Sequence, residues 1–153
     1  MIYGGDKLAE SIAIHFKDAA WDAVTEFLNH IAERGAPRLW FYPGKDNYVI
    51  TLYEYDDLLE EYENNEVEKL LDTLGDFPTA TLCLELRRSQ GDKAVNGATA
   101  LCCQLLNKFD GIVDDLAPES ELWTLDQICS SEQTTRKNFL SSYKKVDGTL
   151  TVA

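Results

Sequence analysis

Basic residues are scarce in this sequence of 153 residues. It contains 14 Lys and Arg against 27 Asp and Glu, which gives a formal net charge of −13. Such a surface repels nucleic acids and anionic membranes through the same counterion effects that attract basic proteins to them. We therefore expect no nucleic-acid partner and no membrane partner, and any macromolecular partner is expected to be a basic protein.

Long apolar runs are also lacking. No stretch approaches the roughly 18 consecutive apolar residues that a membrane-spanning helix requires. The N-terminal residues, MIYGGDKLAES, show no basic region followed by an apolar one, so no signal peptide is predicted. The sequence therefore predicts neither a signal peptide nor a membrane-spanning helix.

The four cysteines are placed in a way that favours free thiols. Cys83 lies in an alternating apolar run, Cys102 and Cys103 lie in an apolar helical pattern, and only Cys129 lies in polar sequence. Adjacent cysteines on a helix point about 100° apart, which is poor geometry for a mutual disulfide. Buried, reduced thiols are therefore predicted, and these favour the cytoplasm.

Signatures of catalysis and of metal binding are missing. The sequence has no GxSxG elbow, no GxxxxGK[ST] loop and no GxGxxG turn after a strand. His15 and His30 have no Cys or Asp at metal-ligand spacing, and Asp110, Asp114 and Asp115 lack the EF-hand spacing. A pair of catalytic carboxylates, as in glycosidases, stays open because nothing selects one pair in so acidic a chain. We expect a protein without enzymatic activity, metal or cofactor.

The pattern of apolar residues predicts alternating strands and helices. Residues 11–16 (SIAIHF) alternate as a half-buried strand does, and residues 18–31 repeat apolar residues at helical spacing. The runs LWFY and YVITLY flank the turn sequence PGKDN and predict a hairpin. An acidic stretch then repeats leucines at helical spacing until Gly75 and Pro78, and residues 80–86 (ATLCLEL) alternate again as a strand.

The predicted order is βαββαβ, which is the order of the ferredoxin-like plan, an antiparallel sheet with helices on one face. A third helix over residues 93–109 and a short C-terminal strand within IVDD and ELWTL would complete the α+β fold. Residues 1–129 are therefore predicted to form a single α+β domain. Residues 130–153 are polar with isolated apolar residues, and they are predicted to form a peripheral extension.

Acidic residues are concentrated in two segments. Glu54 to Asp76 contains ten acidic residues and one basic residue, Lys69, and Asp110 to Asp126 contains six acidic residues and no basic one. Like charges four residues apart on a helix destabilise it by a few tenths of a kcal/mol per pair. A helix with no other role would gain from lysines at these positions. The pattern therefore indicates an electronegative binding surface, and an ordinary solvated helix face is the alternative.

Aromatic residues in these segments offer contact area to a protein partner with little rotamer entropy to lose. The carboxylates would steer a basic partner and pair with its Lys and Arg side chains. The predicted partner-binding residues are Tyr55, Asp56, Asp57, Glu60, Glu61, Tyr62, Glu63, Glu66, Asp114, Asp115, Glu119, Glu121 and Trp123.

The segment LLNKFDGIVDDLAPESELWTLDQI, at positions 105–128, carries a family resemblance. A helix that ends in Phe-Asp-Gly passes through an acidic turn to a Trp-Thr-Leu-Asp-Gln-Ile run. Together with the size and the acidic balance, this ending resembles bacterial immunity proteins of polymorphic or contact-dependent growth inhibition toxin systems. The resemblance implies a cytoplasmic, non-catalytic toxin inhibitor that acts through protein–protein interaction. Its partner would be one cognate toxin domain, often a nuclease, bound one-to-one.

Two other functions fit the same charge. A DNA mimic that inhibits a nucleic-acid-binding protein should space its carboxylates along a line at the phosphate repeat of DNA. An acidic adaptor or secretion chaperone should show an exposed apolar groove for its client and should form a dimer. The immunity protein is instead expected to be a monomer or a weak dimer.

Overall fold

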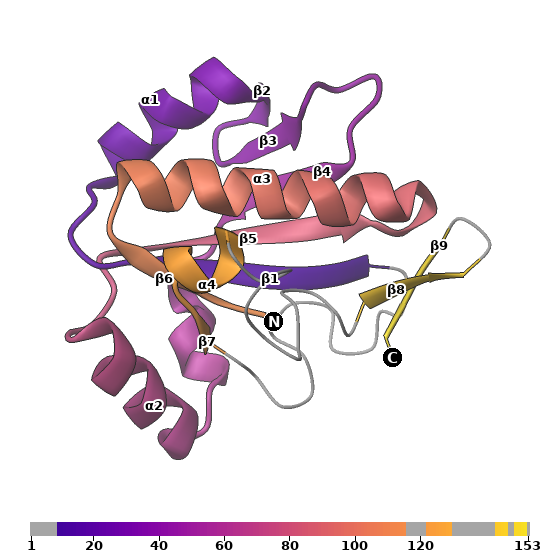
Figure 1. Ribbon diagram of the computed structural model, residues 1–153. Coiled ribbons are helices and arrows are strands. Elements are labelled where there is room, and N and C mark those ends of the chain that lie inside the picture. Colours follow the sequence, from indigo (N-terminus) through magenta and orange to yellow (C-terminus); the bar gives the residue numbers. More distant parts are fainter. Residues whose placement is uncertain (1–8, 116–121, 130–142, 147–148, 153) are drawn as a thin grey trace.

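One large antiparallel sheet organises the computed structural model, which describes residues 9–115, 122–129, 143–146 and 149–152 (Figure 1). Its seven strands lie in the order β2-β3-β4-β5-β1-β6-β7. The strands are β1 (Ala9–Phe16), β2 (Glu33–Ala36), β3 (Leu39–Tyr42), β4 (Ile50–Glu54), β5 (Ala80–Arg87), β6 (Gly111–Asp114) and β7 (Leu122–Trp123). A separate pair, β8 (Tyr143–Val146) and β9 (Thr149–Val152), forms a two-stranded ribbon.

Helical segments cover both faces of the large sheet. They are α1 (Trp21–Ile31), the 3-10 helix η1 (Asp56–Glu61), α2 (Asn64–Leu74), the 3-10 helix η2 (Arg88–Gln90), α3 (Asp92–Lys108) and α4 (Leu125–Cys129). In Figure 1, α1 and α3 lie above the sheet and α2 lies below it. Within the part of the chain that is described, no helix is long and apolar enough to cross a membrane.

The two central strands, β1 and β5, are buried on both sides, because their alternating side chains enter two different cores. Ile12, Ile14 and Phe16 of β1 face the larger core, beneath α1 and α3. Ala13 of β1 and Cys83 of β5 face the other side, where Leu58 of η1 packs against them. Hence β5 is buried at five consecutive positions, Ala80 to Leu84, rather than at every second one.

Several sequence predictions are confirmed at the level of elements. Leu82, Leu84 and Leu86 are all fully buried in the larger core, as their alternation predicts. The helix predicted over residues 93–109 is α3, which spans Asp92–Lys108, and the hairpin around PGKDN is formed by β3 and β4. The class is therefore α+β.

The detailed architecture differs from the ferredoxin-like prediction. The sheet has seven strands rather than four, and β5 lies between β4 and β1, antiparallel to both. No parallel crossover is needed, because α2 connects two neighbouring antiparallel strands. The prediction of helices on one face is also wrong, since Leu70 and Leu74 of α2 pack on the opposite face, against Ile112 of β6.

The acidic stretch forms two helical pieces instead of one. The 3-10 helix η1 ends at Glu61, and α2 begins at Asn64, with Tyr62 and Glu63 between them. Gly75 ends α2 in a left-handed conformation with φ of 97°, as a glycine after a helix commonly does.

Gly111 lies where β6 approaches β1. The helix α3 ends at Lys108, and Gly111 begins β6. A Cβ atom at this position would lie 2.6 Å from the backbone oxygen of His15. The missing side chain therefore allows β6 to approach β1 closely.

The edges of the large sheet are short strands. At one edge lies β2, whose four residues are all exposed and whose pairing with β3 is interrupted by a register shift between Arg34 and Ala36. At the other edge lies β7, with two residues.

Candidate functional site

The acidic segment, defined here as residues 54–76, folds as η1, α2 and the turns beside them. Its apolar residues hold it to the sheet, since Leu58, Leu70 and Leu74 are buried. Its exposed carboxylates, called the acidic surface below, are those of Asp57, Glu60, Glu61, Glu63, Glu68, Asp72 and Asp76. The helical spacing of leucines thus places these acids outward, as the sequence predicts.

The start of α2 uses two of the predicted partner-binding acids. Glu63 is the N-cap, and the Glu66 carboxylate accepts a hydrogen bond of 2.8 Å from the backbone N–H of Glu63. The two residues form a capping box, which satisfies backbone donors that a helix start leaves open. Glu66 is half-buried, so this local role accounts for its position.

A buried polar network anchors the junction between η1 and α2 to the sheet. The Tyr62 hydroxyl donates to Oδ2 of Asp114 at 2.6 Å, and Nε2 of His15 lies 2.9 Å from the same hydroxyl. Nδ1 of His15 lies 3.0 Å from the Thr81 hydroxyl oxygen. These four residues, called the Tyr62 network below, come from β1, β5, β6 and the residue after η1.

The order of donors in this network defines the state of His15. Because the Tyr62 proton is directed to the Asp114 carboxylate, the Tyr62 oxygen accepts the Nε2–H of His15. Nδ1 then accepts from the Thr81 hydroxyl, so a neutral imidazole satisfies both ring nitrogens. Burial lowers the pKa of His15 to about 4, which favours this neutral form.

The network is a structural anchor rather than a site of proton exchange. The His15 side chain is 0% exposed, and both of its ring nitrogens are engaged. The pKa of Tyr62 is raised, first by burial and second by the negative charge of Asp114. His15 therefore cannot exchange a proton with a ligand without an opening of the structure.

Three predicted partner-binding residues are buried, which corrects their assignment to a surface. Asp114 and Asp115 are 2% and 3% exposed, and Trp123 is 5% exposed. Trp123 donates its indole N–H to Oδ2 of Asp115 at 3.2 Å. The reason is that β6 and β7 pair at one side of the sheet. Asp114 then bonds to Tyr62, and Asp115 bonds to Trp123.

The other predicted residues divide into three groups. Asp57, Glu60, Glu61 and Glu63 are exposed on the acidic surface, whereas Tyr55 and Tyr62 are half-buried. The Tyr55 hydroxyl donates to the Glu61 carboxylate. Glu119, Glu121 and the side chain of Asp56 lie outside the described residues.

Phe77 was missed by the sequence analysis. Its side chain is 59% exposed, and among the described residues it is the one large apolar side chain that faces solvent. The backbone N–H of Phe77 bonds to Oδ1 of Asp76 at 2.7 Å, so the ring projects beside the end of the acidic surface. The available signal was a phenylalanine outside the helical period, between Gly75 and Pro78.

Within the described residues there is no group of three or more His, Cys, Asp or Glu that could hold a metal ion. The candidate site consists of the acidic surface and Phe77. The Tyr62 network holds the acidic segment in position on the sheet.

We predict that the free energy of unfolding decreases as the pH falls from 7 to 5, in part because of His15. The unfolded chain protonates this group near pH 6.5 and the folded chain only near pH 4, so the unfolded state binds more protons between these values. The contribution lost by pH 5 is about 2 kcal/mol. Urea unfolding of the wild type and of His15→Gln at pH 7 and at pH 5 measures this contribution. The difference in unfolding free energy between the two proteins should be smaller at pH 5 by that amount.

His30→Gln makes the same substitution at an exposed position and is measured in parallel as the matched control. A constant difference in unfolding free energy between the wild type and His15→Gln from pH 7 to pH 5 would show that burial does not lower the pKa of His15.

Tyr62→Phe should destabilise the fold by about 1–3 kcal/mol, because it removes one partner from His15 and one from Asp114 in a buried position. Tyr55→Phe also removes a tyrosine hydroxyl, but this one bonds to the exposed carboxylate of Glu61. The free energy of unfolding should therefore fall by less than about 1 kcal/mol. Denaturant unfolding of both variants gives the comparison. Equal losses would contradict an anchoring role for Tyr62.

No protein-family model matches the chain. Searches of curated proteins and of solved structures give no significant match either. The function is therefore argued from the residues themselves.

Proposed function

We propose that this protein is an immunity protein that binds a basic toxin domain one-to-one and neutralises it through the acidic surface. The observation that supports the proposal most is the separation of roles within residues 54–76. The leucines of this segment are buried against the sheet, and seven of its carboxylates face solvent. A toxin whose cleft is basic, such as a nuclease, offers the complementary charge.

The anchoring of the acidic surface favours tight binding. Tyr62 ties the junction of η1 and α2 to β1 and β6, and the capping box fixes the start of α2. A surface that is ordered before it meets its partner loses less conformational entropy on binding. The carboxylates then act mainly on the rate and the specificity of association.

Phe77 is proposed as the apolar contact of this interface. A few buried anchor side chains, often aromatic, contribute much of the binding energy of an interface when the contacts around them exclude water. Phe77 is exposed, and Asp76 and Asp72 are exposed near the same end of the segment. It takes the role that the sequence analysis assigned to Trp123.

The proposal includes a cytoplasmic location, because an immunity protein must meet the toxin where the toxin acts. Free thiols at all four cysteines agree with a reducing compartment. The absence of catalytic activity is likewise part of the proposal: inhibition would follow from occupation of the toxin surface alone.

Reversal of three charges on the acidic surface tests the assignment. The variant Asp57→Lys, Glu60→Lys, Glu61→Lys should bind the toxin domain encoded by the neighbouring gene about 100-fold more weakly, a loss of about 2.8 kcal/mol. For the wild type, the association rate should fall steeply as salt rises, since the Debye length shrinks from about 30 Å at 0.01 M to about 10 Å at 0.1 M. Stopped-flow kinetics and a growth-protection assay provide the readouts.

The control variant changes the total charge equally but outside the acidic segment. Asp18, Asp22 and Asp46 are exposed, and their replacement by lysine should leave binding within about threefold of wild type at 0.15 M salt, where the Debye length is about 8 Å. Unfolding measurements on both variants separate binding from stability. Unchanged binding and protection by the first variant, or a neighbouring gene that encodes no toxin domain, would contradict the proposal.

A further inference from the structure

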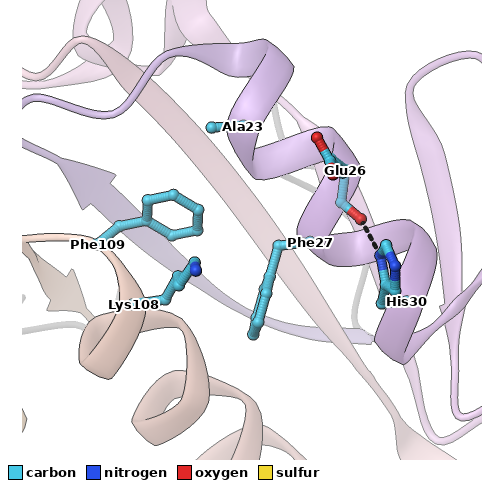
Figure 2. A pocket seen from close by; sticks show the side chains of 6 residues that line it. All are labelled: Ala23, Glu26, Phe27, His30, Lys108 and Phe109. Atoms are coloured by element: carbon cyan, nitrogen blue, oxygen red, sulfur yellow. Dashed lines mark hydrogen bonds between the residues drawn. The ribbon is translucent and has the colours of Figure 1, made fainter.

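A pocket of about 490 Å³ lies between α1 and the C-terminal end of α3. It is lined by Ala23, Glu26, Phe27, His30, Lys108 and Phe109 (Figure 2). These helices cover the face of the sheet opposite η1 and α2, so the pocket is separate from the acidic surface. Its size falls in the range of small-molecule sites in proteins.

The walls of the pocket are aromatic and fixed. The rings of Phe27 and Phe109 meet edge to face, with centroids 5.9 Å apart and an interplanar angle of 86°. Phe109 makes a second edge-to-face contact, at 5.7 Å, with Phe16, which is fully buried in the larger core. The apolar surface that faces the pocket is therefore held by the core itself.

Lys108 supplies a positive charge at this apolar site. Figure 2 shows its amino end on the side of the Phe27 and Phe109 rings, whereas the Glu26 carboxylate is directed away from them. Among the residues that the structure describes, no carboxylate lies within 4.0 Å of the Lys108 amino group. A cation beside two aromatic rings is suited to an anion that carries an apolar body.

His30 contributes less to the choice of ligand. Its Nδ1 lies 2.8 Å from the backbone oxygen of Glu26 and donates to it. This bond leaves Nε2 as the remaining polar atom of the ring and fixes the ring on α1.

We propose that this pocket binds a hydrophobic monocarboxylate, whose carboxylate pairs with Lys108 and whose aromatic or aliphatic body packs against Phe27 and Phe109. The acidic surface lies across the sheet, so its repulsion of an anion is screened at 0.15 M salt, where the Debye length is about 8 Å. The pairing with Lys108 acts at contact distance and is screened far less. This site is independent of the proposed toxin interface.

Three small compounds that share a phenyl group on a three-carbon chain and differ in their polar end test the ligand class. We expect 3-phenylpropionate to bind at least about tenfold more tightly than 3-phenylpropan-1-ol, and 3-phenylpropylamine to bind most weakly. Isothermal titration calorimetry gives the affinities, and chemical-shift changes of the Phe27 and Phe109 rings locate the site. Equal affinity of acid and alcohol, tighter binding of the amine, or no change at the two rings would overturn the proposal.

Two lysine variants separate the local charge from the total charge. Lys108→Met keeps the apolar stem but removes the charge, and it should abolish the preference for the acid over the alcohol. Lys93→Met makes the same change at an exposed residue near the other end of α3, and it should keep that preference. An identical preference in both variants would exclude Lys108 as the carboxylate partner.

A second inference rests on a different observation, the pair of thiols at Cys103 of α3 and Cys129 of α4. Their Sγ atoms lie 2.7 Å apart, although both cysteines are free. A disulfide bond is about 2.05 Å long, so the two sulfurs are within a small movement of bonding distance. Cys129 is exposed and Cys103 is half-buried. We propose that a disulfide such as oxidised glutathione converts this pair into a bridge between α3 and α4.

The reaction is an ordinary thiol–disulfide exchange in two steps. The Cys129 thiolate attacks one sulfur of oxidised glutathione, which forms a mixed disulfide and releases one glutathione thiolate. Cys103 then loses its proton and attacks Sγ of Cys129, which forms the bridge and releases the second glutathione thiolate. In the reduced pair, burial together with the hydrogen bond to Cys129 raises the pKa of Cys103 to about 12, so Cys103 is not the thiol that attacks first.

Treatment of the folded protein with oxidised glutathione tests this pairing. The number of titratable thiols should fall from four to two, peptide mapping without reductant should give a Cys103–Cys129 cross-link, and the melting temperature should rise by several degrees. Cys83→Ser should form the same bridge, whereas Cys103→Ser should stop at a glutathione adduct on Cys129. A stable adduct on Cys129 in the wild-type protein, or a bridge to Cys102, would overturn the proposal.

Discussion

The hydroxyl of Tyr62 is the contact on which the arrangement of the acidic segment depends. It receives the imidazole N–H of His15 and gives its own proton to Asp114, so it joins two strands of the sheet to the chain between η1 and α2. His15 is 47 residues from Tyr62 in the sequence, and Asp114 is 52 residues away. Removal of this hydroxyl would therefore weaken the attachment of both helical pieces, although Leu58, Leu70 and Leu74 would still pack them against the sheet.

The two faces of the sheet pack against different parts of the chain. On one side the side chains of Ile12, Ile14 and Phe16 build the larger core, to which the pocket beside Phe109 is attached. On the other side Ala13 and His15 support the acidic segment. Because neighbouring residues of one strand belong to opposite sides, a change in the register of β1 would disturb both surfaces at once.

Local patterns predicted local features well, and they failed where distant residues decide the outcome. The alternation of Leu82, Leu84 and Leu86 predicted β5, and the leucine spacing predicted that Asp57 and Glu60 face outward. The strand order could not be obtained in this way, because a helix between two strands fits a parallel crossover and an antiparallel return equally.

The errors at the candidate site have a similar origin. Trp123 stands in acidic sequence and so resembled an exposed contact residue, yet its burial depends on the pairing of β7 with β6 and on the bond to Asp115. The partnership of His15 and Tyr62 also joins distant parts of the chain, and no spacing rule indicates it. Phe77 lies outside the apolar period of the preceding helix, so periodicity gives no indication of its exposed side chain.

The short edge strands have a consequence for behaviour at high concentration. An open sheet edge presents unpaired backbone groups on which a second chain can add a strand, and this is a common start of aggregation. Here β2 offers only four residues with an irregular register, and β7 offers two. Glu33 on β2 also accepts the backbone N–H of Lys45 at 2.9 Å, so the turn after β3 folds back over that edge. The two edges of this sheet thus give other copies of the chain little backbone on which to add a strand.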